Sequence, residues 1–152
     1  MADDGTGRSG QGPRDAGELL ELVVRESGVP PAQQVAELSE TLAMVQTGEL
    51  AGWLESLMEY LDPEISGELR EYHLLALKGT VRAFRDRNLS PFMPQHREII
   101  PDMLRDITQV YTQVRASGAD YSREAFGLRA FDYGIHKVYY LDWRLYLSKE
   151  MY

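Results

Sequence analysis

The sequence predicts an all-α protein, a single-domain bundle of five to six helices that follows a disordered N-terminal tail. Three observations support this prediction. Apolar residues recur at spacings of three and four in successive segments, Gly, Pro and capping residues separate these segments, and no segment alternates apolar and polar residues as a strand does. A chain of 152 residues fits one domain with a sizeable core. We therefore expect a tail over residues 1–14 and one helical domain over residues 15–152.

The N-terminal part is expected to contain the tail and one short helix. Residues 1–14 are rich in Gly, Asp and other polar residues, and such a segment cannot bury enough apolar surface to offset the entropy of ordering it. The short helix can be capped by Asp15 and should end near Gly28. Its apolar residues are Leu19, Leu20, Leu22 and Val23.

Two further helices are predicted next. Pro31 suits the first turn of a helix, and Gly48 marks the end of that helix. Its apolar stripe, at helical spacing, consists of Val35, Leu38, Leu42 and Val45. The apolar residues of the following helix are Leu50, Trp53, Leu54, Leu57, Met58 and Leu61.

A long helix is predicted from Asp62 to about Arg87. Asp62 can cap it, Pro63 suits its first turn, and Glu64 suits the positive end of the helix dipole. Its apolar residues are Leu69, Tyr72, Leu75, Leu77, Val81 and Phe84.

Proline residues make the next section irregular, with one short helix over residues 94–100. A regular helix is expected over residues 102–117, where Gly118 stops it. Ser122 can cap the last helix, which should run to about Lys149. The prolines concerned are Pro91, Pro94 and Pro101.

The last predicted helix is rich in aromatic residues and separates into two stripes. One stripe, which contains Phe131, Ile135 and Val138, is typical of a bundle core. The other is made of Tyr and Trp, which provide large contact area at low entropic cost and are enriched in interface hot spots. We therefore predict an interface on this helix, formed by Tyr139, Trp143, Tyr146, Tyr140 and Tyr133.

A second interpretation of this helix stays open, in which it is the central helix of the bundle and is buried on most sides by its own chain. Both interpretations hold together if the protein is a dimer. Gly127 and Gly134 lie one heptad apart on one face, and each costs about 1 kcal/mol relative to Ala in a helix interior. Two such residues on one face predict the close approach of another backbone.

The composition argues against several classes of function. The net charge of −8 disfavours binding to nucleic acids and to anionic membrane surfaces, because both depend on Lys and Arg. The absence of cysteine excludes disulfides, thiolate chemistry and Cys-based zinc sites. We see neither a signal peptide nor a run of ~18 apolar residues, so we expect a cytoplasmic protein that does not cross a membrane.

The sequence predicts no catalytic residues, no metal site and no cofactor. The histidines are His73, His96 and His136, and of these His136 shares a helix face with Asp132, at positions i and i+4. The Glu-x-x-His pairs that di-metal bundles use do not occur. No residue has the setting of a catalytic nucleophile, so we expect a protein without enzymatic activity.

The segment LLALKGTVRAF, residues 74–84, contains Leu77, Lys78 and Gly79 in succession. It resembles the core of histidine phosphotransfer domains, which are four-helix bundles with a His-x-Leu-Lys-Gly element. The phosphorylated histidine of that element would fall at Leu75, and leucine cannot accept a phosphoryl group. The resemblance therefore implies a signalling module that binds partners without being phosphorylated.

Three basic residues at spacings of four and three form a basic patch, namely Lys78, Arg82 and Arg85. One interpretation is a solvated helix face near a helix C-terminus, where cations are favoured. The other is a surface for an acidic partner, including the acidic face of a second copy of the chain.

Together these patterns predict a non-enzymatic helical protein–protein interaction module, an accessory or regulatory subunit that self-associates through its aromatic C-terminal helix. Two alternatives remain open: a degenerate histidine-phosphotransfer-like signalling module, and a helical bundle that binds a small molecule or haem in an aromatic pocket.

Overall fold

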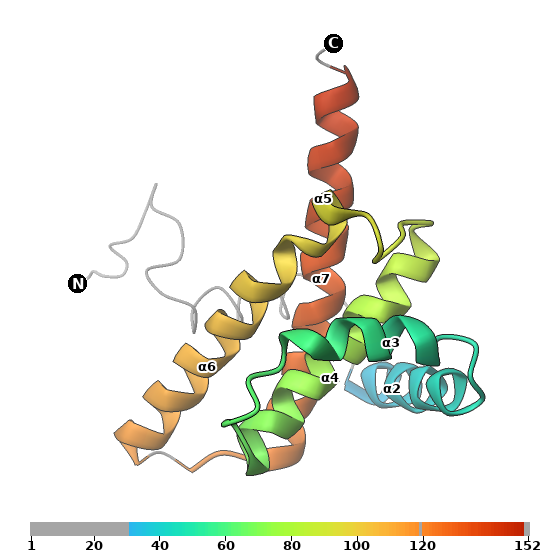
Figure 1. Ribbon diagram of the computed structural model, residues 1–152. Helices are drawn as coiled ribbons and strands as arrows, with labels where there is room; N and C mark the ends of the chain where they lie inside the picture. Colours follow the sequence, from blue (N-terminus) through green and yellow to red (C-terminus); the bar gives the residue numbers. More distant parts are fainter. Residues whose placement is uncertain (1–30, 119, 151–152) are drawn as a thin grey trace.

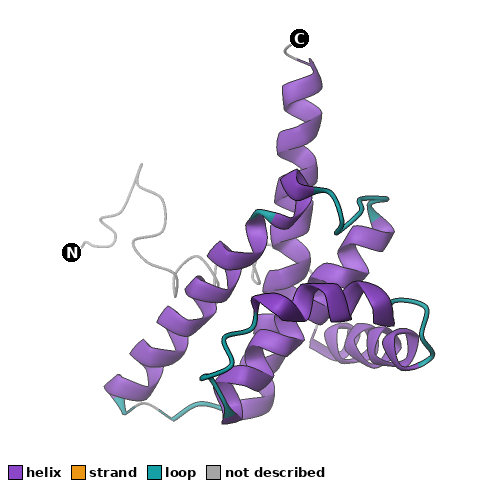
Figure 2. Ribbon diagram, viewed as in Figure 1, coloured by secondary structure: helices purple, strands orange, loops and turns teal. Residues whose placement is uncertain are grey.

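The computed structural model describes residues 31–118 and 120–150, and this part of the chain consists of helices joined by turns and loops (Figures 1 and 2). The all-α prediction and the bundle of five to six helices are therefore confirmed. The predicted tail over residues 1–14 and the short helix over residues 15–28 lie outside the described residues. The elements are α2 (Pro31–Gln46), α3 (Ala51–Leu57), the 3-10 turn η1 (Met58–Tyr60), α4 (Gly67–Asp86), α5 (Pro94–Arg97), α6 (Ile99–Ser117) and α7 (Arg123–Glu150).

The centre of the fold is the pair of long helices α4 and α7, which run in the same direction and cross in Figure 1. Ion pairs join them near both ends of α4, between Glu71 and Arg123 at 3.1 Å and between Arg87 and Asp142 at 2.8 Å. At the crossing, a Cβ on Gly79 would collide with the backbone of α7, so only glycine allows this approach.

Gly127 and Gly134 of α7 predict the close approach of another backbone, and this prediction is confirmed for Gly134. A Cβ on Gly134 would collide with the carbonyl group of Ala76 on α4. Gly127 has a different neighbour, because a Cβ there would stand 3.0 Å from Cδ1 of Leu75, the end of a side chain that can move. Gly134 and Gly79 thus permit the helix crossing, and Gly127 contributes space for a side chain.

Helix α6 packs against the α4–α7 pair through apolar contacts and through polar links that include two side-chain hydrogen bonds. Nε2 of His73 on α4 lies 2.8 Å from Oγ1 of Thr108, and Tyr133 on α7 donates its hydroxyl hydrogen to Asp106. Polar side chains that are buried in this way need such partners. The largest fully buried apolar side chains around them include Tyr72, Phe84, Phe131, Leu57, Leu77, Ile100, Met103 and Ile107.

Helices α2 and α3 form a lateral pair beside α4. Helix α3 buries Leu54 and Leu57 in the core. Helix α2 packs against α4, α7 and α3, and its fully buried residue is the polar Thr41. The heart of the bundle is therefore α4, α6 and α7. Helix α2 is attached to it by the polar contacts of Thr41 and by apolar side chains that pack against the core, including Leu38 and Val45.

The predicted start of the long helix at Asp62 is wrong. The carboxylate of Asp62 accepts a hydrogen bond from the backbone N–H of Glu64 at 2.9 Å, and its carbonyl accepts one from Ile65 at 3.1 Å. Asp62 therefore closes a turn instead of capping the helix. Helix α4 begins later, at Gly67, whose φ of +65° redirects the chain in a conformation that glycine adopts easily.

The boundaries of α6 and α7 agree better with the sequence. Helix α6 begins at Ile99, before the predicted residue 102, because Pro101 falls in the first turn, where its missing N–H costs no hydrogen bond. Gly118 ends α6 with a φ of +70°, as predicted. Ser122 caps α7, since its Oγ accepts a hydrogen bond from the N–H of Ala125 at 3.2 Å.

Candidate protein-interaction surface

Helix α7 has an inner part that lies in the bundle and an outer part that extends beyond the other helices (Figure 1). Phe131 and Val138 of the inner part are almost completely buried. The two parts of α7 differ in burial because α4 ends at Asp86, and the last turns of α7 continue past the end of α4. The outer part of α7 therefore has side chains that its own bundle does not cover.

Five large side chains on the outer part of α7 are exposed, and we call them the aromatic surface. Their exposed fractions are 39% for Tyr139, 56% for Tyr140, 59% for Trp143, 59% for Tyr146 and 38% for Leu147. At about 100° per residue, all five point into one arc of about 120°. They form a continuous apolar and aromatic strip along one side of the helix.

Charged residues beside the aromatic surface are paired within the chain. The guanidinium group of Arg87 lies over the ring of Tyr139, 5.0 Å from its centroid, while it forms the ion pair with Asp142. Arg144 pairs with Glu98 at 3.2 Å. Because these charges already have partners of opposite sign, the aromatic surface offers mainly apolar contact to another molecule.

A cleft of about 460 Å³ lies beside the aromatic surface, and Tyr146 belongs to both. In its wall, Nδ1 of His96 donates a hydrogen bond to the carbonyl of Ser90 at 2.7 Å. The same loop exposes Phe92 and Met93, whose exposed fractions are 56% and 44%. The lining residues are Leu89, Gln95, His96, Asp142, Leu145, Tyr146 and Ser148.

Sequence reasoning missed this cleft, because its walls come from two distant segments, residues 89–96 and 142–148. A local signal was present in the loop. Phe92 and Met93 are apolar residues between two prolines, where they cannot join a helix stripe. Such residues are candidates for surface contacts.

Tyr133, which the sequence grouped with the interface residues, does not belong to the aromatic surface. It is 1% exposed and donates its hydroxyl hydrogen to Asp106. Burial, together with the neighbouring carboxylate of Asp106, raises the pKa of Tyr133. Tyr133 lies on the inner part of α7, toward α6, where a buried phenol finds the acceptor that it needs.

Asp132 and His136, which share a face of α7, lie close together but do not form a hydrogen bond. Nε2 of His136 is 3.8 Å from Oδ2 of Asp132, and this buried oxygen has no hydrogen-bond partner. Burial, and to a lesser extent the charge of Glu37 on α2, raise the pKa of Asp132 to about 6. Burial lowers the pKa of His136. Both groups therefore favour their neutral forms in the folded protein.

The remaining histidine of α4 is part of the core. His73 is 3% exposed, its Nε2 lies beside Thr108, and burial lowers its pKa. Within residues 31–118 and 120–150, no three His, Asp or Glu side chains gather as a metal site would require. In the same part of the chain, no helix combines the length and the apolar character of a membrane span.

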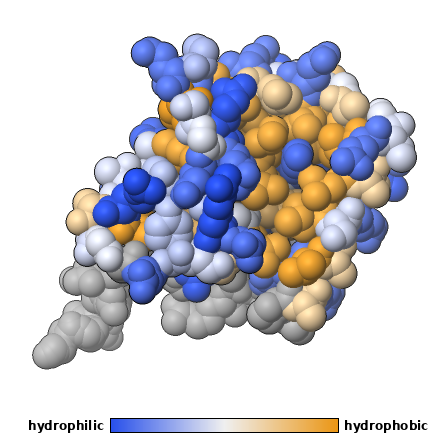
Figure 3. All heavy atoms as spheres, turned by 90° about the horizontal axis from the view of Figure 1, so that it is seen from below, coloured by the Kyte–Doolittle hydropathy of each residue, from blue (hydrophilic) through white to orange (hydrophobic). Residues whose placement is uncertain are grey.

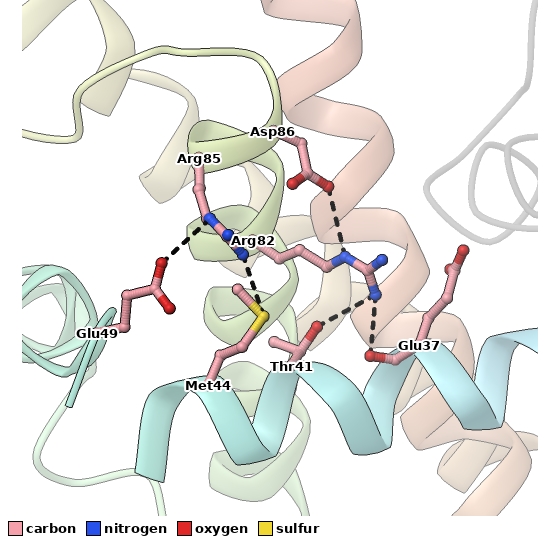
Figure 4. A network of polar contacts seen from close by, with 7 residues as sticks. All are labelled: Glu37, Thr41, Met44, Glu49, Arg82, Arg85 and Asp86. Carbon is pink, nitrogen blue, oxygen red and sulfur yellow. Dashed lines mark hydrogen bonds and ion pairs between the residues drawn. The ribbon is translucent and has the colours of Figure 1, made fainter. Parts of the chain in front are cut away.

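The predicted basic patch makes most of its contacts inside the chain. Arg82 donates hydrogen bonds to the carbonyl of Glu37 at 2.9 Å and to Oγ1 of Thr41 at 3.3 Å (Figure 4). Arg85 pairs with Glu49 at 3.4 Å. Arg82 thus holds α2 against α4, and Arg85 pairs with the turn that follows α2, while a surface for an acidic partner stays a prediction.

The comparisons with known proteins give one match. A family model described as "Domain of unknown function (DUF8786)" matches residues 66–148. The matched region contains α4, α5, α6 and nearly all of α7, including the whole aromatic surface, and it leaves out α2 and α3. Neither the curated proteins nor the solved structures gave a match to the chain.

Proposed function

We propose a function from the premise that the chain belongs to the DUF8786 family, whose model covers more than half of its 152 residues. The protein is a non-enzymatic interaction module of the cytoplasm, an accessory or regulatory subunit, and it associates with a second copy of itself. The observation that carries this proposal is the exposure of Trp143 and its neighbours on the outer part of α7.

The composition of the aromatic surface supports a role in binding. Monomeric proteins rarely leave a contiguous apolar patch of this kind in water, and when they do the patch usually has a function. Trp and Tyr are the residues that most often provide the largest part of binding energy in interfaces. All five residues of the aromatic surface lie inside the region that the family model matches, so the surface is part of the family domain.

A second copy as the partner requires an interface that does not depend on attraction between charges. Two copies that each carry a net charge of −8 repel one another, so their association must depend on apolar contact. The aromatic surface provides such contact, because Arg87 and Arg144 at its edges are already paired. A helix face can also pair with itself across a two-fold axis, which is the commonest symmetry of homodimers.

The experiment that tests the proposal is sedimentation of the full chain over a concentration series. We expect the wild-type chain to associate, and Trp143→Ala to weaken association by about 30-fold, the effect of losing about 2 kcal/mol at a central aromatic anchor. Met58→Ala is the matched control, because Met58 is also exposed, at 37%, but lies in η1 outside the aromatic surface. Met58→Ala should associate as the wild type does.

Two outcomes would contradict the proposal. A wild-type chain that stays monomeric up to about 1 mM, where association is worth only about 4 kcal/mol, has no functional self-association. A wild-type dimer that Trp143→Ala does not weaken has its interface on another surface.

The phosphotransfer-like alternative has less support than self-association. His73, the histidine nearest to the Leu-Lys-Gly element, lies in the core beside Thr108. Gly79 of that element has a packing role, since it permits the crossing with α7. Neither observation favours a phosphate-accepting surface on α4.

A small-molecule-binding bundle is the second candidate, and the cleft beside His96 favours it. Its volume of about 460 Å³ falls in the range of ligand pockets, which is about 300–1,000 Å³. An absorption spectrum of the purified protein tests whether the bound small molecule is haem. A Soret band that His96→Ala removes would support haem binding at the cleft.

A further inference from the structure

The aromatic surface has an internal symmetry about Trp143. Tyr139 and Tyr146 lie before and after Trp143 on one edge of the surface, and Tyr140 and Leu147 lie before and after it on the other edge. The two residues of each edge are one heptad apart, so they differ by only about 20° around the helix axis. A surface of this kind is complementary to its own copy turned end to end. In such a pair Trp143 faces Trp143, Tyr139 faces Tyr146 of the other copy, and Tyr140 faces Leu147.

Charge and bulk favour the antiparallel direction for the second helix. The outer part of α7 extends beyond the other helices, so the bundle of each copy lies at one end of it (Figure 1). In a parallel pair the two bundles would lie side by side, although each copy carries a net charge of −8. In an antiparallel pair the bundles lie at opposite ends of the paired helices, which reduces their repulsion.

The loop between α4 and α5 borders one edge of the aromatic surface, the edge that Tyr139 and Tyr146 form. Arg87, at the start of this loop, lies over the ring of Tyr139, and Leu89 lines the same cleft as Tyr146. A helix that packs on the aromatic surface therefore has this loop at its side.

The exposed side chains of the loop stand on a backbone that hydrogen bonds hold in place. Oγ of Ser90 accepts a hydrogen bond from the N–H of Phe92 at 3.1 Å, and its carbonyl accepts one from the N–H of Met93 at 3.3 Å. Nδ1 of His96 donates to the same carbonyl at 2.7 Å. A contact segment that is already ordered loses less entropy when a partner binds, so Phe92 and Met93 are suited to an interface.

The area that a stable dimer needs also includes the loop. Large aromatic side chains bury about 150–250 Å² each, so the five residues of the aromatic surface, at their exposed fractions, offer about 500 Å². A stable interface takes about 800 Å² from each partner. Phe92 and Met93, at 56% and 44% exposure, add about 200 Å² and bring the total close to this value.

We infer that the second copy packs antiparallel along the outer part of α7, with the two Trp143 side chains at the centre. Phe92 and Met93 of each copy contact the edge of the partner helix that Tyr139 and Tyr146 form. The inference rests on the proposed self-association, and it adds the direction, the register and a second contact segment. Each contact occurs twice, as it must across a two-fold axis.

Thiol cross-linking tests the register, because the chain has no cysteine of its own. Full-length chains with Tyr140→Cys and with Leu147→Cys are mixed at a concentration where the wild type is dimeric, and a short bifunctional thiol reagent is added. In the antiparallel register positions 140 and 147 face one another, whereas two copies of the same position are offset by about 9–12 Å along the axis. We expect the mixed product, identified by its intact mass, to form several-fold faster than either product of identical chains.

A parallel pair gives a different result. It places position 139 beside position 140 of the other copy, so a mixture of Tyr139→Cys and Tyr140→Cys would cross-link faster than the first mixture, and this would overturn the inference. Equal rates for all products of the first mixture would mean that the helices have no fixed register, which also overturns it. Either result, with association that Trp143→Ala still weakens, leaves the proposed self-association in place.

A dimer through another surface is also distinguishable. Figure 3 shows that residues of high hydropathy also gather on the side seen from below, which faces away from the outer part of α7 in Figure 1. A dimer formed there would resist Trp143→Ala and give no faster mixed product, which overturns the inference together with self-association through the aromatic surface.

Phe92→Ala tests the contact of the loop. We expect the dissociation constant from sedimentation to rise about fivefold, the ratio that about 1 kcal/mol gives. The melting temperature of the monomer should stay unchanged, because Phe92 is exposed within its own chain. Met58→Ala again serves as the control, since Met58 is exposed outside both contact segments. An unchanged dissociation constant in Phe92→Ala would place the loop outside the interface and overturn this contact.

Discussion

Gly134 on α7 faces the carbonyl group of Ala76 on α4 with no space for a side chain between the two backbones. The two longest helices of the described chain are held at this distance by Gly134 and by Gly79, which faces Phe131 in the same way. A methyl group at either position must push the helices apart, and the core on both sides of the crossing would open with them.

We therefore expect Gly134→Ala to lower the free energy of unfolding by about 1–3 kcal/mol, although alanine is the better helix former. Urea unfolding at neutral pH measures the effect. The control is Gly52→Ala in α3, where nothing lies within 4 Å of the new Cβ, and this change should stabilise the protein by about 0.5–1 kcal/mol. Equal stability of Gly134→Ala and the wild type would contradict the backbone contact.

Tyr133→Phe should destabilise the monomer by about 1–2 kcal/mol. The substitution removes the hydroxyl that donates to Asp106 and leaves this carboxylate with Lys137, whose Nζ is 3.6 Å away. Tyr140→Phe, one heptad further along α7 on the exposed part, should change stability by less than about 0.5 kcal/mol. Chemical unfolding of the two variants, at dilutions where the chain is monomeric, compares them directly.

Asp132→Asn should stabilise the protein at pH 7.5 and have little effect near pH 4. The pKa of Asp132 is raised in the folded state from 3.8 to about 6, so its contribution to stability is complete below the unfolded pKa and is lost as the pH rises through about 6. The asparagine side chain does not ionise, so at pH 7.5 the free energy of unfolding of the variant should exceed that of the wild type by an amount on the order of 2–3 kcal/mol. Unfolding free energies between pH 4 and pH 8 measure the difference.

His136→Asn controls this experiment, because the pKa of His136 is lowered in the folded state. Its contribution is present above the unfolded pKa and is lost as the pH falls through the folded pKa, so this variant should gain stability relative to the wild type in acid. A difference between Asp132→Asn and the wild type that stays constant with pH would mean that the carboxyl group titrates normally.

Arg82→Met should loosen α2 and leave the rest of the bundle folded. The substitution keeps part of the side-chain volume but loses the hydrogen bonds to Glu37 and Thr41, at a cost of about 1–3 kcal/mol. Amide hydrogen exchange should accelerate in α2 and stay unchanged in α6. Arg105→Met is the control, since the side chain of Arg105 is 70% exposed and pairs only with the nearby Asp102 among the described residues. Uniform acceleration over all helices would contradict a local role.

Local chemistry let the sequence predict much of the fold. Gly118 and Ser122 end and begin helices as predicted, because a left-handed C-terminal residue and a capping hydroxyl act within a few residues. The start of α4 could not be predicted in the same way. Asp62 has the right chemistry for a cap, but its carboxylate binds the N–H of Glu64 in a turn, and only the packed chain decides between two such local structures.

In the candidate site, too, the sequence predicts one property of two residues of α7, and the tertiary structure decides another. Tyr133 and Tyr140 are seven residues apart, so helical periodicity places them on the same side of α7, and the sequence by itself determined that they share a stripe. Their exposed fractions, 1% and 56%, differ because the neighbouring helices cover the inner part of α7 and end before the outer part. Periodicity fixes the angle of a side chain about its helix axis, but the lengths and positions of the surrounding helices fix its burial, and these are set by the tertiary structure.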